Sequence, residues 1–201
     1  MSERCEWATS TDDYVAYHDD EWGRPVTDDV GLYEKISLEG FQSGLSWLTI
    51  LRKREHFRAA FAGFDPVVVS RFGPRDVERL LTDASIVRHR GKIEATIANA
   101  TATLAVQADV GSLAALVWSF EPDRRDRRAP QKLDDVEATT PESKALAKEL
   151  KRRGFRFVGP TTAYAAMQAI GIVNDHVANC LVRTVCEADR QKAAVPKLSR
   201  S

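Results

Sequence analysis

Two pairs of cysteine and histidine residues, one near each end of the 201-residue chain, could bind a transition-metal ion. His176 and Cys180 lie four residues apart in the stretch VNDHVANC, so on a helix they would share one face. Cys5 and His18 form the second pair. If the two pairs met, they would form a Cys2His2 site for one Zn²⁺ ion. Because the protein would supply all four ligands, the site would be structural rather than catalytic.

These residues also have an ordinary alternative role. A buried cysteine often acts as a small hydrophobic side chain, and a histidine on an amphipathic helix often only packs. The split spacing matches no zinc-finger pattern, and Cys186 has no matching partner, so we expect it in the core. Three widely spaced cysteines also form a poor disulfide framework. A further possibility is a cysteine hydrolase with Cys180 as nucleophile and His176 as base.

The first fifty residues are rich in aromatic and acidic side chains. Aromatic rings can stack on an unpaired base, and a buried carboxylate can accept hydrogen bonds from its amino group. This composition therefore suggests a pocket for a base, although a small helical core could use the same residues. The candidates are Trp7, Tyr14, Tyr17, Trp22, Tyr33, Glu39 and Trp47.

A second candidate for ligand binding is the stretch RGFRFVGPTT (153–162), which joins two predicted helices. Gly154 and Gly159 allow backbone conformations and close approaches that other residues resist, and the N–H groups that begin the next helix can hold a phosphate oxygen. Lys151, Arg152, Arg153 and Arg156 add positive charge nearby. The pattern resembles a helix-hairpin-helix element over 141–171, although an ordinary helix corner would have the same glycines.

The candidate residues must be positioned by the surrounding secondary structure. Helical periodicity dominates along the chain, so we predict an all-α fold. Helices are indicated over 28–40, 46–63, 66–72, 76–81, 88–106, 139–154 and 160–171, with Asn174 capping a last one. Asp28 or Asp29, Ser46 and Thr140 are the expected N-terminal caps. We interpret the charged, proline-containing segment 121–141 as a surface loop between two helical blocks, and 187–201 as a flexible tail.

Composition indicates a single water-soluble unit over 1–201. The chain is 43% hydrophobic and 29% charged, and no segment approaches the roughly 18 apolar residues of a membrane span. The net charge of +0 hides acidic residues concentrated in 12–34 and basic residues in 52–58, 87–92 and 151–156. The polar N-terminus resembles no targeting signal. We therefore expect a cytoplasmic monomer that does not bind membranes.

Several segments together resemble a known family. They are RCEWA (4–8), YVAYHDDEWGRPVTDD (14–29), LEGFQSGLSW (38–47), VRHRGKIEA (87–95) and the stretch from Lys151 to Cys180. In this order they are similar to the bacterial 3-methyladenine DNA glycosylase I family. The resemblance implies a helix-hairpin-helix enzyme that flips alkylated adenine out of double-stranded DNA, hydrolyses its N-glycosidic bond and releases 3-methyladenine during base excision repair.

The resemblance also assigns roles to residues. Its structural zinc ligands match Cys5, His18, His176 and Cys180. Its base-recognising carboxylate, here also the candidate catalytic residue, matches Glu39, and its base-binding aromatic residues match Tyr14, Tyr17 and Trp47. The segment that approaches DNA and fills the gap left by the flipped base contains Gln42, Gly44 and Leu45. In the hairpin, the expected DNA-binding residues are Gly154, Gly159 and Thr161.

Some residues depart from the related pattern. Many members of the wider superfamily carry a catalytic aspartate where this chain has Asn174, which cannot act as a carboxylate. Asp175 follows it and could line the site, but we expect this residue rather to cap the final helix or to orient His176. Phe41 stands where a polar residue is expected between Gly40 and Gln42. These differences leave the activation of water open.

Two functions remain in competition at this level. The first is a monofunctional glycosylase, since no lysine lies in a motif that suggests Schiff-base chemistry. The second is a non-catalytic, zinc-stapled sensor that binds alkylated DNA without cutting the glycosidic bond. Release of free base from methylated DNA separates them.

Overall fold

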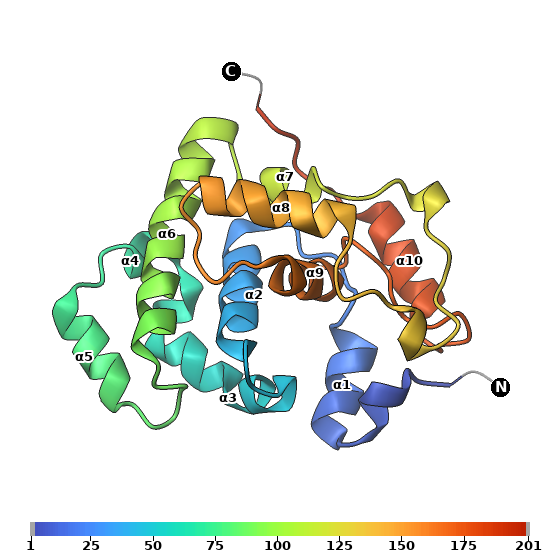
Figure 1. The fold of residues 1–201 in the computed structure, drawn as a ribbon, viewed down its shortest axis with the longest axis horizontal. Coiled ribbons are helices and arrows are strands. Elements are labelled where there is room, and N and C mark those ends of the chain that lie inside the picture. The colour runs from blue at the N-terminus through green and yellow to red at the C-terminus, as the bar shows by residue number, and fades with distance from the viewer. Residues whose placement is uncertain (1–2, 200–201) are drawn as a thin grey trace.

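The computed structural model describes residues 3–199, and the regular elements in that range are all helices. Figure 1 shows their arrangement. The α-helices are α1 (Asp12–Asp20), α2 (Asp29–Gln42), α3 (Trp47–Ala60), α4 (Pro66–Val69), α5 (Pro74–Thr82), α6 (Arg90–Val110), α7 (Leu113–Trp118), α8 (Pro141–Arg152), α9 (Pro160–Ala169) and α10 (Arg183–Lys192). Short 3-10 helices are η1 (Glu6–Thr9), η2 (Ala62–Phe64), η3 (Arg124–Asp126) and η4 (Leu133–Asp135). The predicted all-α class is confirmed.

Several helices begin at the predicted caps. The side chains of Asp28, Ser46 and Thr140 each accept a hydrogen bond from a backbone N–H in the first turn of α2, α3 and α8, respectively. Each bond satisfies a donor that the helix itself cannot pair. Gly154 follows α8 with a φ of +94°, the left-handed conformation typical of a residue just past a helix end.

Helix α2 is the central element and lies among its neighbours in Figure 1. It contacts α3, α6, α7 and α9, and every residue from Leu32 to Phe41 is buried. Tyr33 is fully buried, and its hydroxyl donates a 2.8 Å hydrogen bond to the carbonyl oxygen of Thr96. Tyr33 is therefore a core residue, and α2 carries Glu39 at its C-terminal end on a rigid support.

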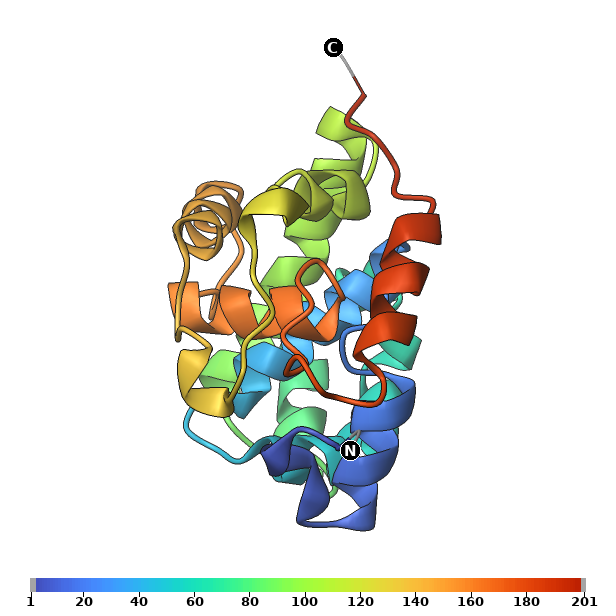
Figure 2. The same cartoon turned by 90° about the vertical axis from the view of Figure 1, so that its right-hand side faces the viewer.

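The two ends of the chain lie together. Backbone N–H groups connect Glu3 to the Asn179 carbonyl at 3.2 Å and Leu181 to the Glu3 carbonyl at 2.9 Å. In Figure 2, the dark blue start of the chain lies beside the orange-red segment that precedes α10. This pairing brings the two Cys/His pairs into one region.

The segment around His176 corrects the predicted final helix. Residues 173–182 are irregular, and α10 begins only at Arg183, so Asn174 caps no helix. Several backbone N–H groups of this segment donate to distant residues, as in the 2.7 Å bond from Ala178 to the Pro130 carbonyl and the 2.9 Å bond from Leu181 to the Glu3 carbonyl. Because these groups pair with distant parts of the chain, they cannot form the bonds between residues i and i−4 of a helix.

The C-terminal segment also differs from the prediction, because residues 187–192 belong to α10 rather than to a tail. Arg190 is only 5% exposed and donates to the carbonyls of Gly171 and Ile172 and to the Glu121 carboxylate. These bonds fix α10 against the segment that follows α9. The predicted loop 121–141 is irregular and mostly exposed apart from η3 and η4.

Candidate active site and metal centre

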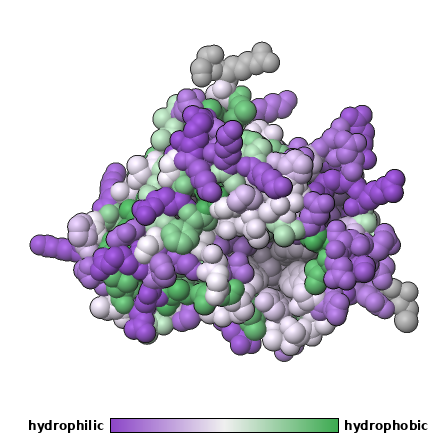
Figure 3. Space-filling model, viewed as in Figure 1, coloured by the Kyte–Doolittle hydropathy of each residue, from purple (hydrophilic) through white to green (hydrophobic). Residues whose placement is uncertain are grey.

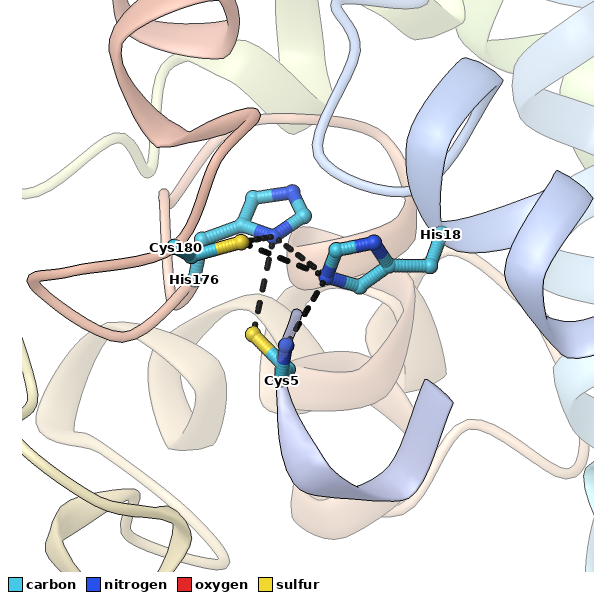
Figure 4. Close-up of side chains that lie close together, drawn as sticks. All are labelled: Cys5, His18, His176 and Cys180. Atoms are coloured by element: carbon cyan, nitrogen blue, oxygen red, sulfur yellow. Dashed lines mark hydrogen bonds between the residues drawn. The ribbon is translucent and has the colours of Figure 1, made fainter. Parts of the chain in front are cut away.

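Cys5, His18, His176 and Cys180 converge on one point, as Figure 4 shows. Their ligand atoms lie within 4.8 Å of one another. His176 Nδ1 is 3.1 Å from His18 Nε2, 3.5 Å from Cys180 Sγ and 3.7 Å from Cys5 Sγ, and Cys180 Sγ is 3.4 Å from His18 Nε2. The predicted ligands therefore meet, although an irregular segment and not a helix face presents His176 and Cys180.

The geometry of this cluster fits a tetrahedral metal ion. Metal bonds of about 2.3 Å to sulfur and about 2.0 Å to nitrogen place tetrahedral ligand atoms roughly 3.3–3.8 Å apart. The four measured separations above lie near that range. With four protein ligands the coordination is complete, so a bound ion would hold the chain and have no position for a reacting water.

The outer nitrogen of each histidine is fixed by a hydrogen bond. His18 Nδ1 lies 2.8 Å from Asp19 Oδ1, and Arg4 holds that carboxylate on its other side. His176 Nε2 donates to the Trp22 carbonyl at 3.0 Å. These bonds place the protons on the outer nitrogens and turn the lone pairs of the inner nitrogens toward the cluster.

Burial makes the cluster suitable for a cation. It lowers the pKa of His176 to about 4, so the imidazole is neutral and its lone pair is available. It raises the pKa of Cys5 to about 12, since a buried thiolate needs a positive partner. The backbone N–H of Val177 already points at Cys5 Sγ from 3.5 Å.

Cys186 lies next to this cluster without being one of the four converging ligands. It is fully buried, and its sulfur lies 3.5 Å from the outer nitrogen of His176. It packs with Cys5, Cys180 and Val182 in a small core of its own. This position agrees with the predicted core role.

An open cavity of about 490 Å³ lies beside the Cys/His cluster. Figure 3 shows a hollow on this face, between the positions that α9 and α1 occupy in Figure 1. The aromatic residues that line the cavity are Trp7, Tyr14, Tyr17, Trp22, Trp47 and Tyr164. The polar residues include Glu39, Gln42, Thr161, Gln168 and Asp175. The structure thus brings together the expected base-binding residues, while Tyr33 lies elsewhere.

The aromatic rings support one another around the cavity. Trp7 meets Tyr14 edge to face with ring centres 5.6 Å apart, and Tyr17 lies 5.4 Å from Trp47. The Tyr14 hydroxyl accepts a 3.0 Å hydrogen bond from the Leu48 N–H at the start of α3. Because the rings hold each other, they form a preorganised surface for a flat ligand.

Glu39 is the buried carboxylate of the cavity. It is 5% exposed, and burial raises its pKa to about 7, an effect that the charge of Lys35 one turn earlier offsets only in part. A carboxylate near the C-terminal end of a helix also meets the negative end of the helix dipole. Both effects disfavour the ionised carboxylate, and a cationic ligand would offset them. The site is therefore electrostatically suited to a positively charged ring.

Asp175 lines the cavity, which is the alternative position and not the favoured one. Its carboxylate accepts hydrogen bonds from the Tyr164 hydroxyl at 2.5 Å and the Gln168 amide at 2.9 Å, and pairs with Arg127 at 2.5 Å. It neither caps a helix nor touches the outer nitrogen of His176, because its side chain faces α9 and the cavity. Asn174 is buried away from the cavity and donates to the Arg183 carbonyl.

The loop 121–141 forms one wall of the cavity, a role that sequence reasoning missed. Leu133, Val136, Glu137 and Ala138 line it. The Arg127–Asp175 ion pair ties this loop to the segment that carries the metal ligands. The length of the loop was an available signal, because loops longer than about 15 residues in compact domains usually have a function.

The predicted DNA-binding residues lie around the cavity. Gln42 and Thr161 line it, whereas Gly44, Leu45, Gly154 and Gly159 do not. Gly44 and Leu45 are in the turn after α2, and Leu45 is 39% exposed. Gly154 and Gly159 are in the hairpin between α8 and α9. Gly44, Leu45 and Gly154 are exposed, and Gly159 is half-buried.

The sequence and the fold of this chain match those of known glycosylases. A model described as methyladenine glycosylase matches residues 7–184, and the chain therefore belongs to the methyladenine glycosylase family. DNA-3-methyladenine glycosylase 1 of Escherichia coli (strain K12) is 50% identical over 178 residues, which cover 89% of this chain and 95% of that protein.

Solved structures agree with this assignment. A crystal structure of 3-methyladenine DNA glycosylase I superposes with a TM-score of 0.86 at 50% identity, covering 89% of this chain and 98% of that one. The Staphylococcus aureus enzyme, studied for its recognition of 3-methyladenine, gives 0.86 at 33% identity over 90% of this chain and 97% of its own. Among the described helices, none combines the length and apolar character that a bilayer crossing needs.

Proposed function

We propose that this protein is a monofunctional glycosylase that flips 3-methyladenine from double-stranded DNA and hydrolyses its N-glycosidic bond. The observation that carries the proposal is the Glu39 carboxylate, 5% exposed, in a cavity lined by aromatic rings. Family membership supports the same reaction. We also propose that the chain acts as one unit, as a monomer, in the cytoplasm.

The chemistry of the lesion suits this cavity. Methylation at N3 gives the attached adenine a positive charge, so it leaves as a neutral base and needs little acid assistance. The faces of Tyr14, Tyr17 and Trp47 attract an electron-poor cationic ring, and an ionised Glu39 adds a charge that ordinary adenine cannot use. Binding that favours the cation thus selects the substrate, whose own positive charge already makes the glycosidic bond labile.

The proposed DNA surface consists of the Gln42–Leu45 turn and the hairpin. The turn would fill the gap left by the flipped base, and N–H groups around Gly154, Gly159 and Thr161 would hold the phosphate backbone. Gly159 supports this role. Its φ of −66° suits any residue, and a Cβ atom there would meet no atom of the protein within 4 Å. Since nothing within the described chain requires glycine, an approaching backbone is the better explanation.

The metal in this proposal is one structural Zn²⁺ ion. Two thiolates and two imidazoles are the ligand set that zinc prefers, and the outer hydrogen bonds of both histidines favour coordination by their inner nitrogens. When bound, zinc would supply cross-linking and no step of the reaction. The ion would hold the segment that carries Asp175 against the start of the chain.

The test is chromatographic detection of free bases released from methylated DNA. Wild-type protein should release 3-methyladenine, and Glu39→Gln should reduce the rate by about 10²-fold or more because the charge that favours the cation is lost. Glu34→Gln is the matched control, since Glu34 is another buried acid of α2 that pairs with Arg58 and does not line the cavity. Tight lesion binding without release by the wild type would support the sensor instead.

A further inference from the structure

The turn after α2 has a defined geometry. Ser43 has φ −49° and ψ 115°, Gly44 has φ +80°, and the Leu45 N–H donates to the Gln42 carbonyl at 2.7 Å. These values describe a type II turn, which needs a positive φ at its third residue. The Gln42 amide closes the turn on its other side through a 3.1 Å bond to the Leu45 carbonyl. The turn therefore presents Leu45 in one orientation.

Lys92, in the first turn of α6, reaches across to hold this turn. Its Nζ donates to the carbonyl of Phe41 at 2.8 Å and to the carbonyl of Ser43 at 2.5 Å. The first is in the last turn of α2, and the second belongs to the second residue of the turn itself. One ammonium group thus joins the end of α2, the turn and α6.

The burial of the Lys92 ammonium group is unfavourable for folding. The residue is 8% exposed, burial lowers its pKa, and no acidic side chain between residues 3 and 199 forms an ion pair with it. The only compensation is the partial negative charge of unpaired carbonyls at a helix end. An apolar side chain of equal length would avoid the desolvation cost, so the charge has to be explained by what it holds in place.

The neighbours of Lys92 connect the turn to the hairpin. The His89 ring accepts a hydrogen bond from the Lys92 N–H and meets Phe157 of the hairpin edge to face at 6.3 Å. A Cβ atom at Gly40 would lie 3.4 Å from the Cβ of Phe157, so the hairpin rests directly on the end of α2. The segment VRHRGK (87–92) therefore lies between the two proposed DNA contacts.

We propose that Lys92 is a positioning residue for base flipping, which holds the Gln42–Leu45 turn in the conformation that enters the DNA and fixes its place relative to the hairpin. This inference rests on the proposed function, since it takes the turn as the inserting element. Lys92 itself touches neither the cavity nor the base. Its contribution should therefore matter only when a base has to be removed from a stacked duplex.

Lys92→Met tests the inference, because methionine has a similar length without the charge or the donors. Release of 3-methyladenine from double-stranded methylated DNA should fall at least tenfold. Release from heat-denatured DNA should change less than twofold, as should binding of free 3-methyladenine measured through the fluorescence of the cavity tryptophans. Lys53→Met is the matched control: the Nζ of Lys53 also donates to two backbone carbonyls, those of Ala84 and Ser85, which lie outside the turn and the hairpin. It should match the wild type on both DNAs.

A second variant keeps the test independent of folding. Gly44→Ala strains the turn directly through its positive φ and should give the same duplex-selective loss. In the double variant with Lys92→Met, the fold-loss of duplex activity should be smaller than the product of the two single fold-losses, because both substitutions act through one turn. Equal losses by Lys92→Met on both DNAs, full activity of this variant on duplex, or multiplicative losses would overturn the inference. Failure of the proposed function would look different, because the wild type would then release no base.

Discussion

The metal cluster and the base cavity are neighbours built from similar residue types, yet they differ in how their polar groups are satisfied. In the cluster, the ligand atoms face one another, and each histidine is fixed from outside by Asp19 or Trp22. In the cavity, Glu39 is buried with a raised pKa and faces an open space. Trp7 packs against His18 of the first and Tyr14 of the second. The difference suggests that the cluster provides stability and the cavity provides chemistry.

Removing a metal ligand should have the largest effect, and it should act on stability. Cys180→Ser, or prolonged treatment with a chelator, should lower the melting temperature by about 10 °C or more, since structural metal binding contributes several kcal/mol of folding free energy. Metal analysis of untreated protein should give close to one ion per chain.

Cys186→Ser is the control for this experiment, because Cys186 is a buried cysteine beside the cluster and not one of the four converging ligands. It should retain the metal. If Cys180→Ser lost its metal and still melted like the wild type, the division between a stabilising cluster and a reactive cavity would be wrong.

The ionisation of Glu39 should separate stability from activity, because a rise in pH is expected to lower the stability of the protein and to raise its activity. The pKa of Glu39 rises from 4.5 in the unfolded chain to about 7 in the folded protein. Between these values the folded state keeps a proton that the unfolded state has lost, so stability falls as pH rises. The full difference, on the order of 3 kcal/mol, is reached above pH 7. Base release should increase over the same range as the carboxylate ionises.

The measurement is a set of unfolding curves from about pH 5 to 8 for the wild type and Glu39→Gln, together with rates of base release by the wild type. Subtracting the two stabilities isolates Glu39 from other titrating groups. The free energy of unfolding of Glu39→Gln, relative to that of the wild type, should increase as pH rises. A constant difference between the two proteins would show that Glu39 titrates normally.

The smallest effect is expected at Trp7, which borders both sites. Trp7→Leu should weaken binding of 3-methyladenine by about tenfold, as expected for loss of an aromatic contact of about 1.4 kcal/mol, and leave the metal content unchanged. Metal analysis and fluorescence titration with the free base would measure the two effects. Loss of metal with normal base affinity would place Trp7 in the cluster instead.

Local features of this fold could be predicted from sequence, because the residues that decide them are close together. Asp28, Ser46 and Thr140 cap their own helices, and the signal lies within three residues in each case. The segment around His176 could not be predicted in this way. Its helical spacing is genuine, but bonds to Glu3 and Pro130, far away in the chain, decide its conformation.

The same distinction between local and long-range signals applies to the candidate site. Tyr14, Tyr17, Glu39 and Trp47 belong to short motifs, and the structure places them in one cavity as expected. Asp175 and Arg127 are 48 residues apart, and the wall that they secure exists only because the loop folds back on α9. No local pattern contains that information, and the same limit applies to the long-range contacts of Lys92.

The pairing of the two chain ends has a consequence for synthesis. During synthesis Cys5 and His18 leave the ribosome well before His176 and Cys180, which lie more than 150 residues further along the chain. The Cys/His cluster therefore cannot close on a nascent chain that stops short of Cys180, and the segment that carries Asp175 lacks its contact with the start of the chain until then. A chain that stops before His176 would lack two of the four candidate ligands, so metal content would distinguish it from chains that extend beyond Cys180.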